Sequence, residues 1–212
     1  VTALEAAVLR SRGAGRRKSH FDPAIGHSKQ SSGAYQMALI QTQATEVAEG
    51  AVRAIYDQVL TRLPFVPKPV QLMSASPELM VGYWSMMQRV LGHPRVSREL
   101  LALLRLGVAM DSDFPYCVEL NGMGLQMLLG LSDAQLAEVR QDPSKAELAE
   151  PELALARFAM RAVSEPEAVA AADVQRLRDL GWDDESIFVA TFQGAFMLTM
   201  GVLFTAFQMH RD

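Results

Sequence analysis

The most reactive residue type in this 212-residue sequence occurs once, as Cys117. It lies in the stretch DFPYCVELN (113–121), where an acidic turn and a proline precede a helical pattern. A thiol in the first turn of a helix lies at the positive end of the helix dipole, which favours the thiolate. Because the thiolate is the nucleophilic form of cysteine, this position indicates a catalytic thiol.

The residues around Cys117 favour two opposite interpretations. Negative charge on Asp111, Asp113 and Glu119 would raise the thiol pKa and oppose the thiolate. Asn121 follows four residues after Cys117, so the two side chains project from one helix face and can form a polar contact. A lone cysteine is also commonly a small buried hydrophobe. A reactive thiol and an inert one therefore both remain open.

The composition is that of a globular protein with one folded core. Half of the residues are hydrophobic and 21% are charged, which suffices for a single domain. The net charge of −4 and the pI near 5.6 argue against a nucleic-acid partner. One cysteine excludes an internal disulfide or a multi-cysteine zinc site and fits a reducing, cytoplasmic compartment. No phosphate loop or metal cluster is recognisable, so no cofactor and no metal are expected.

The pattern of apolar residues predicts a chain of helices separated by short breaks. Thr45 is expected to cap the first helix, and Pro64, Pro67 and Pro69 are expected to form a rigid linker behind it. No convincing two-residue alternation is present, so the predicted fold class is all-α. The expected helices cover 46–63, 78–91, 98–110, a fourth from a cap at Ser112 or Asp113 to 129, then 133–140, 150–163, 172–180 and a long C-terminal helix capped by Asp183 or Asp184.

The last expected helix contains no charged residue from 186 to 209. That length could span a bilayer. Gln193, Thr199 and Gln208 interrupt the apolar run, however, and no Lys/Arg cluster flanks it, which favours a buried helix over a membrane span. A helix that is apolar all round is typical of a bundle centre or an oligomer interface, so a homo-oligomer and no membrane partner are expected.

Residues 1–36 differ from the rest of the chain. They carry six basic residues against Glu5 and Asp22, and Gly, Ser and His are frequent. Such a segment is typical of a basic, loop-rich arm or extension. The expected helical domain then covers 37–212. The basic run at 16–18 is interpreted as a solvated patch or a strap on an acidic subunit.

The stretch FPYCVELN (114–121) resembles the Cys-x-x-Cys-x-x-x-His motif of the AhpD-like alkylhydroperoxidase and carboxymuconolactone decarboxylase superfamily. The resemblance covers roughly residues 40–210 and is to the peroxidase-related branch. It implies an all-α, AhpD-like helical bundle that assembles as a dimer, trimer or hexamer. Further segments that fit this branch in order are 49–57, 65–67, 76–80, 97–101, 131–132 and 180–185.

The chemistry that the resemblance implies is thiol peroxidation. In the family the second motif cysteine attacks the peroxide, the first resolves the sulfenic acid, and the histidine and an upstream glutamate move protons. By position, Cys117 matches the attacking cysteine, Phe114 stands where the resolving cysteine would be, and Asn121 replaces the histidine. Ala102 falls at the glutamate position, and Glu99 is the carboxylate one turn earlier. The full disulfide cycle is therefore not available to this chain alone.

A pocket next to the thiol is also expected. Phe114 and Tyr116 flank Cys117, and Met123 and Met127 follow on the same helix. Flexible methionines adapt to apolar ligands as readily as they fill a core. These residues therefore predict an adaptable apolar pocket.

Three functions remain open. The first is a thiol peroxidase-like, antioxidant oxidoreductase, in which an external thiol reductant resolves the Cys117 sulfenic acid. The second is a non-catalytic binding or assembly protein with a decayed site. The third is a decarboxylase or isomerase of a small organic acid, with Glu99, Glu119 and His93 as its acid and base candidates.

Overall fold

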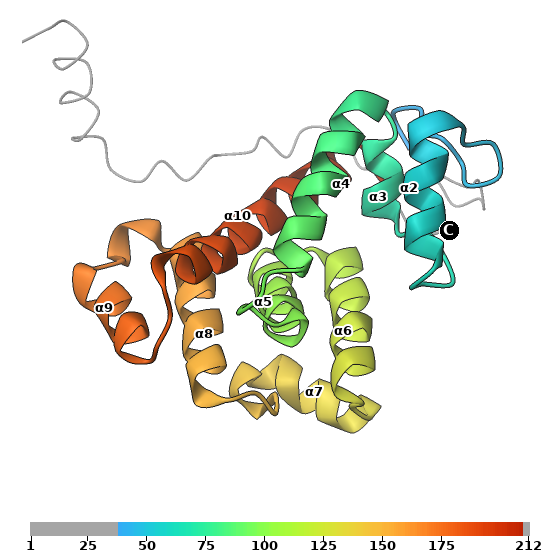
Figure 1. Cartoon of the computed structure of the whole chain (residues 1–212). Helices are drawn as coiled ribbons and strands as arrows, with labels where there is room; N and C mark the ends of the chain where they lie inside the picture. The colour runs from blue at the N-terminus through green and yellow to red at the C-terminus, as the bar shows by residue number, and fades with distance from the viewer. Residues whose placement is uncertain (1–37, 210–212) are drawn as a thin grey trace, which may run out of the picture. The chain divides into compact units, whose positions relative to one another are not determined.

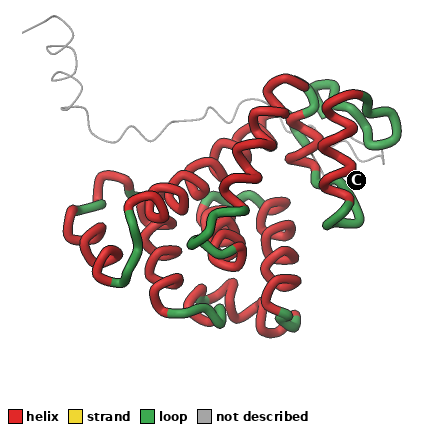
Figure 2. The backbone as a smooth tube through the Cα atoms, viewed as in Figure 1, coloured by secondary structure: helices red, strands yellow, loops and turns green. Residues whose placement is uncertain are grey.

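The computed structural model describes residues 38–209, so the expected arm at 1–36 lies outside the described residues. Within 38–209 every regular element is a helix (Figure 2), and the predicted all-α class is confirmed. The helices are α2 (Gly50–Leu60), α3 (Lys68–Met73), α4 (Pro77–Leu91), α5 (Arg98–Asp111), α6 (Pro115–Leu129), α7 (Asp133–Gln141), α8 (Glu150–Ser164), α9 (Ala171–Asp179) and α10 (Asp184–Ala206), with 3₁₀ turns at Pro143–Lys145 and Pro166–Ala168.

Helix α5 forms the centre of the core. Its leucines Leu100, Leu101, Leu103 and Leu104 are almost completely buried, because α5 packs against α6, α8 and α10. Figure 1 shows α5 between α6 and α8, with α7 joining the far ends of that pair. The short loop between α5 and α6 leads from this core helix into the first turn of α6, where Cys117 lies.

Several helix ends follow the sequence pattern. The hydroxyl of Ser97 accepts from Leu100 N at 3.0 Å, and the carboxylate of Asp183 accepts from Ser186 N at 2.7 Å. Ser132 opens α7 with a capping box, and Gly130 ends α6 in the left-handed conformation at φ 68°. These caps satisfy backbone groups that no helical partner reaches.

Two expectations about the N-terminal half are wrong. Helix α2 begins at Gly50 instead of residue 46, because residues 45–47 form a turn and Gln43 Oε1 accepts from Glu49 N at 3.4 Å. Thr45 is therefore not the cap. The expected proline linker contains helix α3, for which Pro67 is the N-cap and Pro69 lies in the first turn, a position that tolerates proline.

The start of α6 also differs from the prediction. Phe114 is its N-cap, instead of Ser112 or Asp113. Asp113 adopts a positive φ of 53°, and Phe114 N donates to Ala109 O at 3.0 Å. This geometry closes the C-terminus of α5, so Asp113 ends one helix instead of starting the next.

Helix α10 is buried on one face only. Ala190, Met197 and Met200 face the core, whereas Phe188 and Val202 are mostly exposed. By length and composition α10 could cross a membrane, and 44% of its most apolar window is buried. The helix that the sequence predicted to be buried is therefore buried on one face of α10 within this chain and exposed on the other.

Candidate functional site

Cys117 lies in the first turn of α6 and is 2% exposed. Burial raises the pKa of its thiol to about 11, because a low-dielectric environment disfavours the charged form. Of the two interpretations that the sequence left open, this environment therefore favours the inert thiol. Desolvation outweighs the dipole at this position.

The acidic neighbours are not the cause of this pKa shift. Glu119 is exposed at the surface of α6 and forms an ion pair with Arg140, with 3.3 Å between Oε2 and Nη2. Asp113 is exposed in the turn. Both carboxylates are in contact with solvent, which screens their effect on a buried thiol.

Asn121 is buried, and hydrogen bonds fix its side chain. Its Nδ2 donates to the backbone carbonyl of Cys117 at 2.8 Å and lies 3.8 Å from the Sδ atom of Met197. Its Oδ1 accepts from Arg105 Nε at 2.9 Å. The expected polar contact between Asn121 and Cys117 exists, but it reaches the backbone oxygen. Asn121 holds Arg105 in place and offers no base to the thiol.

Phe114, at the sequence position that the resemblance assigns to the resolving cysteine, packs against α10. Its ring lies directly against the backbone of Gly201 on α10, where an added Cβ would come within 2.1 Å of the ring. Only glycine allows this close approach. Phe114 and Gly201 therefore form a packing contact that joins α6 to α10.

Tyr116 has a structural role in the same turn. Its ring stacks on Phe204 of α10 with 4.6 Å between the centroids, and its hydroxyl accepts from Lys68 N at 3.1 Å. These contacts connect α6 to α10 and to the start of α3. Tyr116 also lines a cavity beside Cys117.

Two predicted site residues lie away from the thiol. Met123 lines a shallow surface cavity between α6 and α7, since six residues along a helix turn the side chain by about 240° from Cys117. Glu99 lies in the first turn of α5. It is separated from the Cys117 end of α5 by about 18 Å of helix. Ala102, at the glutamate position of the motif, is completely buried.

Cys117 lies in the wall between two cavities. The outer cavity, of about 520 Å³, is lined by Phe114, Tyr116, Gly201 and Phe204. The second cavity, here called the arginine cavity, has a volume of about 330 Å³. Its polar lining residues are Tyr83, Arg105, Asn121 and Gln193, together with Arg62 and Arg98.

The sequence predicted an apolar pocket beside the thiol, but not the arginines that line the arginine cavity. Arg105 is the only charged residue between Glu99 and Asp111, and a lone cation in an apolar helix signals a special environment. Arg98 lies seven residues earlier and so on the same helix face. Gln193, a polar residue within the uncharged C-terminal segment, likewise indicates a special environment. The sequence does not show that α5 and α10 bring these residues together.

No residue that lines the arginine cavity is an aspartate, a glutamate or a histidine. His93 instead closes the turn before α5, where its Nδ1 accepts from Val96 N at 3.1 Å. Within residues 38–209 no group of three or more His, Cys, Asp or Glu side chains is arranged to hold a metal ion.

No family model matches this sequence, and no curated protein matches it. Two solved structures resemble its fold. A peroxidase-related protein from Ralstonia eutropha JMP134, described as an alkylhydroperoxidase AhpD core, aligns with a TM-score of 0.72 and 16% identity over 84% of this chain and 94% of its own. A peroxidase-related protein from Silicibacter sp. TM1040 aligns with a TM-score of 0.71 and 18% identity over 86% of this chain and 96% of its own. The chain therefore has the AhpD-like helical fold.

Proposed function

We propose that this chain is a peroxidase-related, AhpD-like protein that holds a small, largely apolar organic ligand in the arginine cavity and does not run a disulfide-based redox cycle. The observation that carries this proposal is the state of Cys117. The thiol is buried, its pKa is raised to about 11, and no carboxylate or histidine lines the arginine cavity beside it. A cavity whose lining has no carboxylate or histidine to transfer protons near neutral pH is suited to binding.

The rate of reaction between Cys117 and a thiol reagent, measured against pH, tests this proposal. A silent thiol at pH 7, with reaction rising only toward pH 11, is the expected result, because only the thiolate reacts. Cys117→Ser is the blank, since the sequence has no other cysteine. A fast reaction with a midpoint below about 8.5, the free-cysteine value, would contradict the binding proposal.

A one-cysteine peroxidase is the second candidate, favoured by the place of Cys117 in the walls of both cavities. The thiolate would attack one peroxide oxygen, the O–O bond would break, and the alkoxide would leave as the alcohol after taking up a proton. Two external thiols would then reduce the sulfenic acid, releasing water and their own disulfide. The sum is ROOH + 2 R′SH → ROH + H₂O + R′SSR′.

Consumption of cumene hydroperoxide in the presence of dithiothreitol distinguishes the two candidates. Turnover that disappears in Cys117→Ser would establish the peroxidase. Equal background rates in the wild type and the variant would support the binding protein. The decarboxylase or isomerase hypothesis has less support: Glu119 lines the outer cavity beside Cys117, but neither Glu99 nor His93 lines either cavity.

A further inference from the structure

Arg105 brings an uncompensated positive charge to the arginine cavity. Its Nε donates to Asn121 Oδ1 at 2.9 Å, and no carboxylate among residues 38–209 forms an ion pair with it. Burial lowers the pKa of Arg105 to about 10, so the guanidinium stays charged at neutral pH. A cation that is removed from water without an anion is costly, and the free energy falls when an anion pairs with it.

Two neutral polar side chains share the cavity with Arg105. Burial raises the pKa of Tyr83 to about 12, so its hydroxyl keeps its proton and can donate. Gln193 is 2% exposed, and its Oε1 atom has no hydrogen-bond partner. Buried polar atoms are normally paired with protein, water or a ligand. Arg105 and Gln193 therefore leave polar capacity for an occupant of the cavity.

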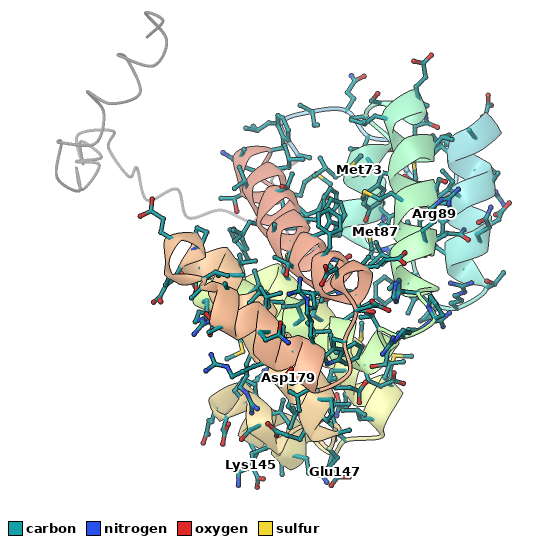
Figure 3. All side chains as sticks on the ribbon, turned by 60° about the vertical axis from the view of Figure 1, so that its left-hand side comes forward. Met73, Met87, Arg89, Lys145, Glu147 and Asp179 are labelled. Atoms are coloured by element: carbon teal, nitrogen blue, oxygen red, sulfur yellow. The ribbon has the colours of Figure 1, made fainter. Side chains whose placement is uncertain are left out.

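Apolar side chains form the rest of the cavity wall. They come from five different helices and from the segment before α3, and include Val59, Leu63, Met87, Phe196 and Met200. Figure 3 shows Met87 between the ribbons of α4 and α10. A volume of about 330 Å³ lies within the range of about 300–1,000 Å³ typical of small-molecule sites. An apolar wall with a few convergent polar groups is also typical of such sites.

The positively charged residues that line the cavity favour a negatively charged ligand. Arg62, Arg98 and Arg105 contribute three positive charges, and no Asp or Glu lines the cavity. Arg62 and Arg98 are exposed, so they would attract an anion toward the cavity while Arg105 meets it inside. The one partly buried cation, Arg105, matches one negative charge, and a guanidinium fits a carboxylate with two parallel hydrogen bonds.

We propose that the arginine cavity binds an amphipathic organic acid, with its single carboxylate on Arg105 and its apolar body against the α4 and α10 side chains. This inference rests on the proposed binding function and specifies the chemical class of the ligand. Arg105 is the anchor, Asn121 positions it, and the Tyr83 hydroxyl can donate a further hydrogen bond to the carboxylate, whereas Gln193 Oε1 can only accept from a donor elsewhere on the ligand.

Isothermal titration calorimetry with decanoate and decan-1-ol tests the inference, because the two probes share an apolar chain and differ in charge. At pH 7 the wild type is expected to bind decanoate at least about tenfold more tightly than the alcohol, as hydrogen bonds to charged groups are the stronger ones. Arg105→Met should remove this preference and change decanol affinity by less than about threefold. Arg105→Lys, which keeps the charge, should retain part of it.

Arg89→Met is the matched control, since Arg89 is an exposed arginine of α4 outside the arginine cavity. It should behave as the wild type. Equal affinity of the wild type for both probes, or a preference for decanoate that survives in Arg105→Met, would overturn the inference and leave the binding function standing. Binding of neither probe would overturn both. The comparison of decanoate with decan-1-ol on the wild type needs no variant, so it tests the inference even if Arg105→Met does not fold.

Discussion

The thiol of Cys117 is closed off from both solvent and polar partners. The sequence resemblance assigns Cys117 to the attacking position of the motif, but Cys117 is 2% exposed, and the Asn121 amide bonds to its carbonyl instead of its sulfur. The family chemistry needs a thiolate and a proton carrier. At this site burial suppresses the thiolate, and asparagine cannot exchange a proton at neutral pH.

This environment predicts a specific pH dependence of stability. The folded-state pKa of Cys117 is raised from 9.0 to about 11, so the folded state holds the thiol proton more tightly than the unfolded chain. The stabilisation is complete below pH 9 and is lost as the pH rises from about 9 to about 11. Relative to Cys117→Ala, the wild type should lose up to about 2–3 kcal/mol of unfolding free energy across this range.

Urea unfolding of both proteins at a series of pH values measures this difference. Other groups that titrate in the range, including Tyr83, are common to both proteins and cancel. Parallel curves for the two proteins would show that the thiol titrates alike in the folded and unfolded states.

At the scale of elements, the site depends on how closely α6 approaches α10. Phe114 and Tyr116 at the start of α6 contact Gly201 and Phe204 of α10. These contacts fix the first turn of α6, and with it Cys117, against the core. The aromatic ring of Phe114 occupies the space that the missing side chain of Gly201 leaves free, so a change of either residue alone should lower the stability of the protein.

Gly201→Ala should therefore destabilise the protein. The new Cβ would overlap the Phe114 ring, and overpacking of this kind costs about 1–3 kcal/mol. Gly82→Ala on α4 is the matched control, since no atom lies within 4 Å of its added Cβ. It should stabilise the protein by about 0.5–1 kcal/mol through helix propensity. Thermal unfolding compares the two, and equal shifts would contradict the close contact.

At the scale of the whole molecule, α10 presents an exposed apolar face. Phe188 is 68% exposed and Val202 is 59% exposed. Phe188, Phe192, Phe196 and Tyr83 form a row of stacked rings along α10 and α4. A contiguous apolar surface of this kind marks an interaction site, and the homo-oligomer expected from the sequence would cover it.

Phe188→Asp tests that expectation, because a carboxylate in an apolar interface is not compensated. Size-exclusion chromatography with light scattering should give an oligomer for the wild type and a lower mass for the variant. Lys145→Asp, a charge change at an exposed position of the turn after α7, should leave the mass unchanged. A monomeric wild type would end the oligomer hypothesis.

The sequence by itself determined the helical class, most helix ends and the position of the thiol. These features depend on neighbouring residues: Ser97, Ser132 and Asp183 cap helices through backbone amides only a few residues away. The start of α2 and the helix after Pro67 were missed, because turn and proline signals there permit more than one local structure.

Only the tertiary structure decided what surrounds the thiol. The pKa of Cys117 depends on which helices exclude water from it. The arginine cavity exists because α5 brings Arg105 and α10 brings Gln193 to one space. Met123 and Glu99 are close to the motif in sequence but lie on other faces or at other ends of their helices. Desolvation and the meeting of distant side chains are properties of packing, which spacing along the chain does not specify.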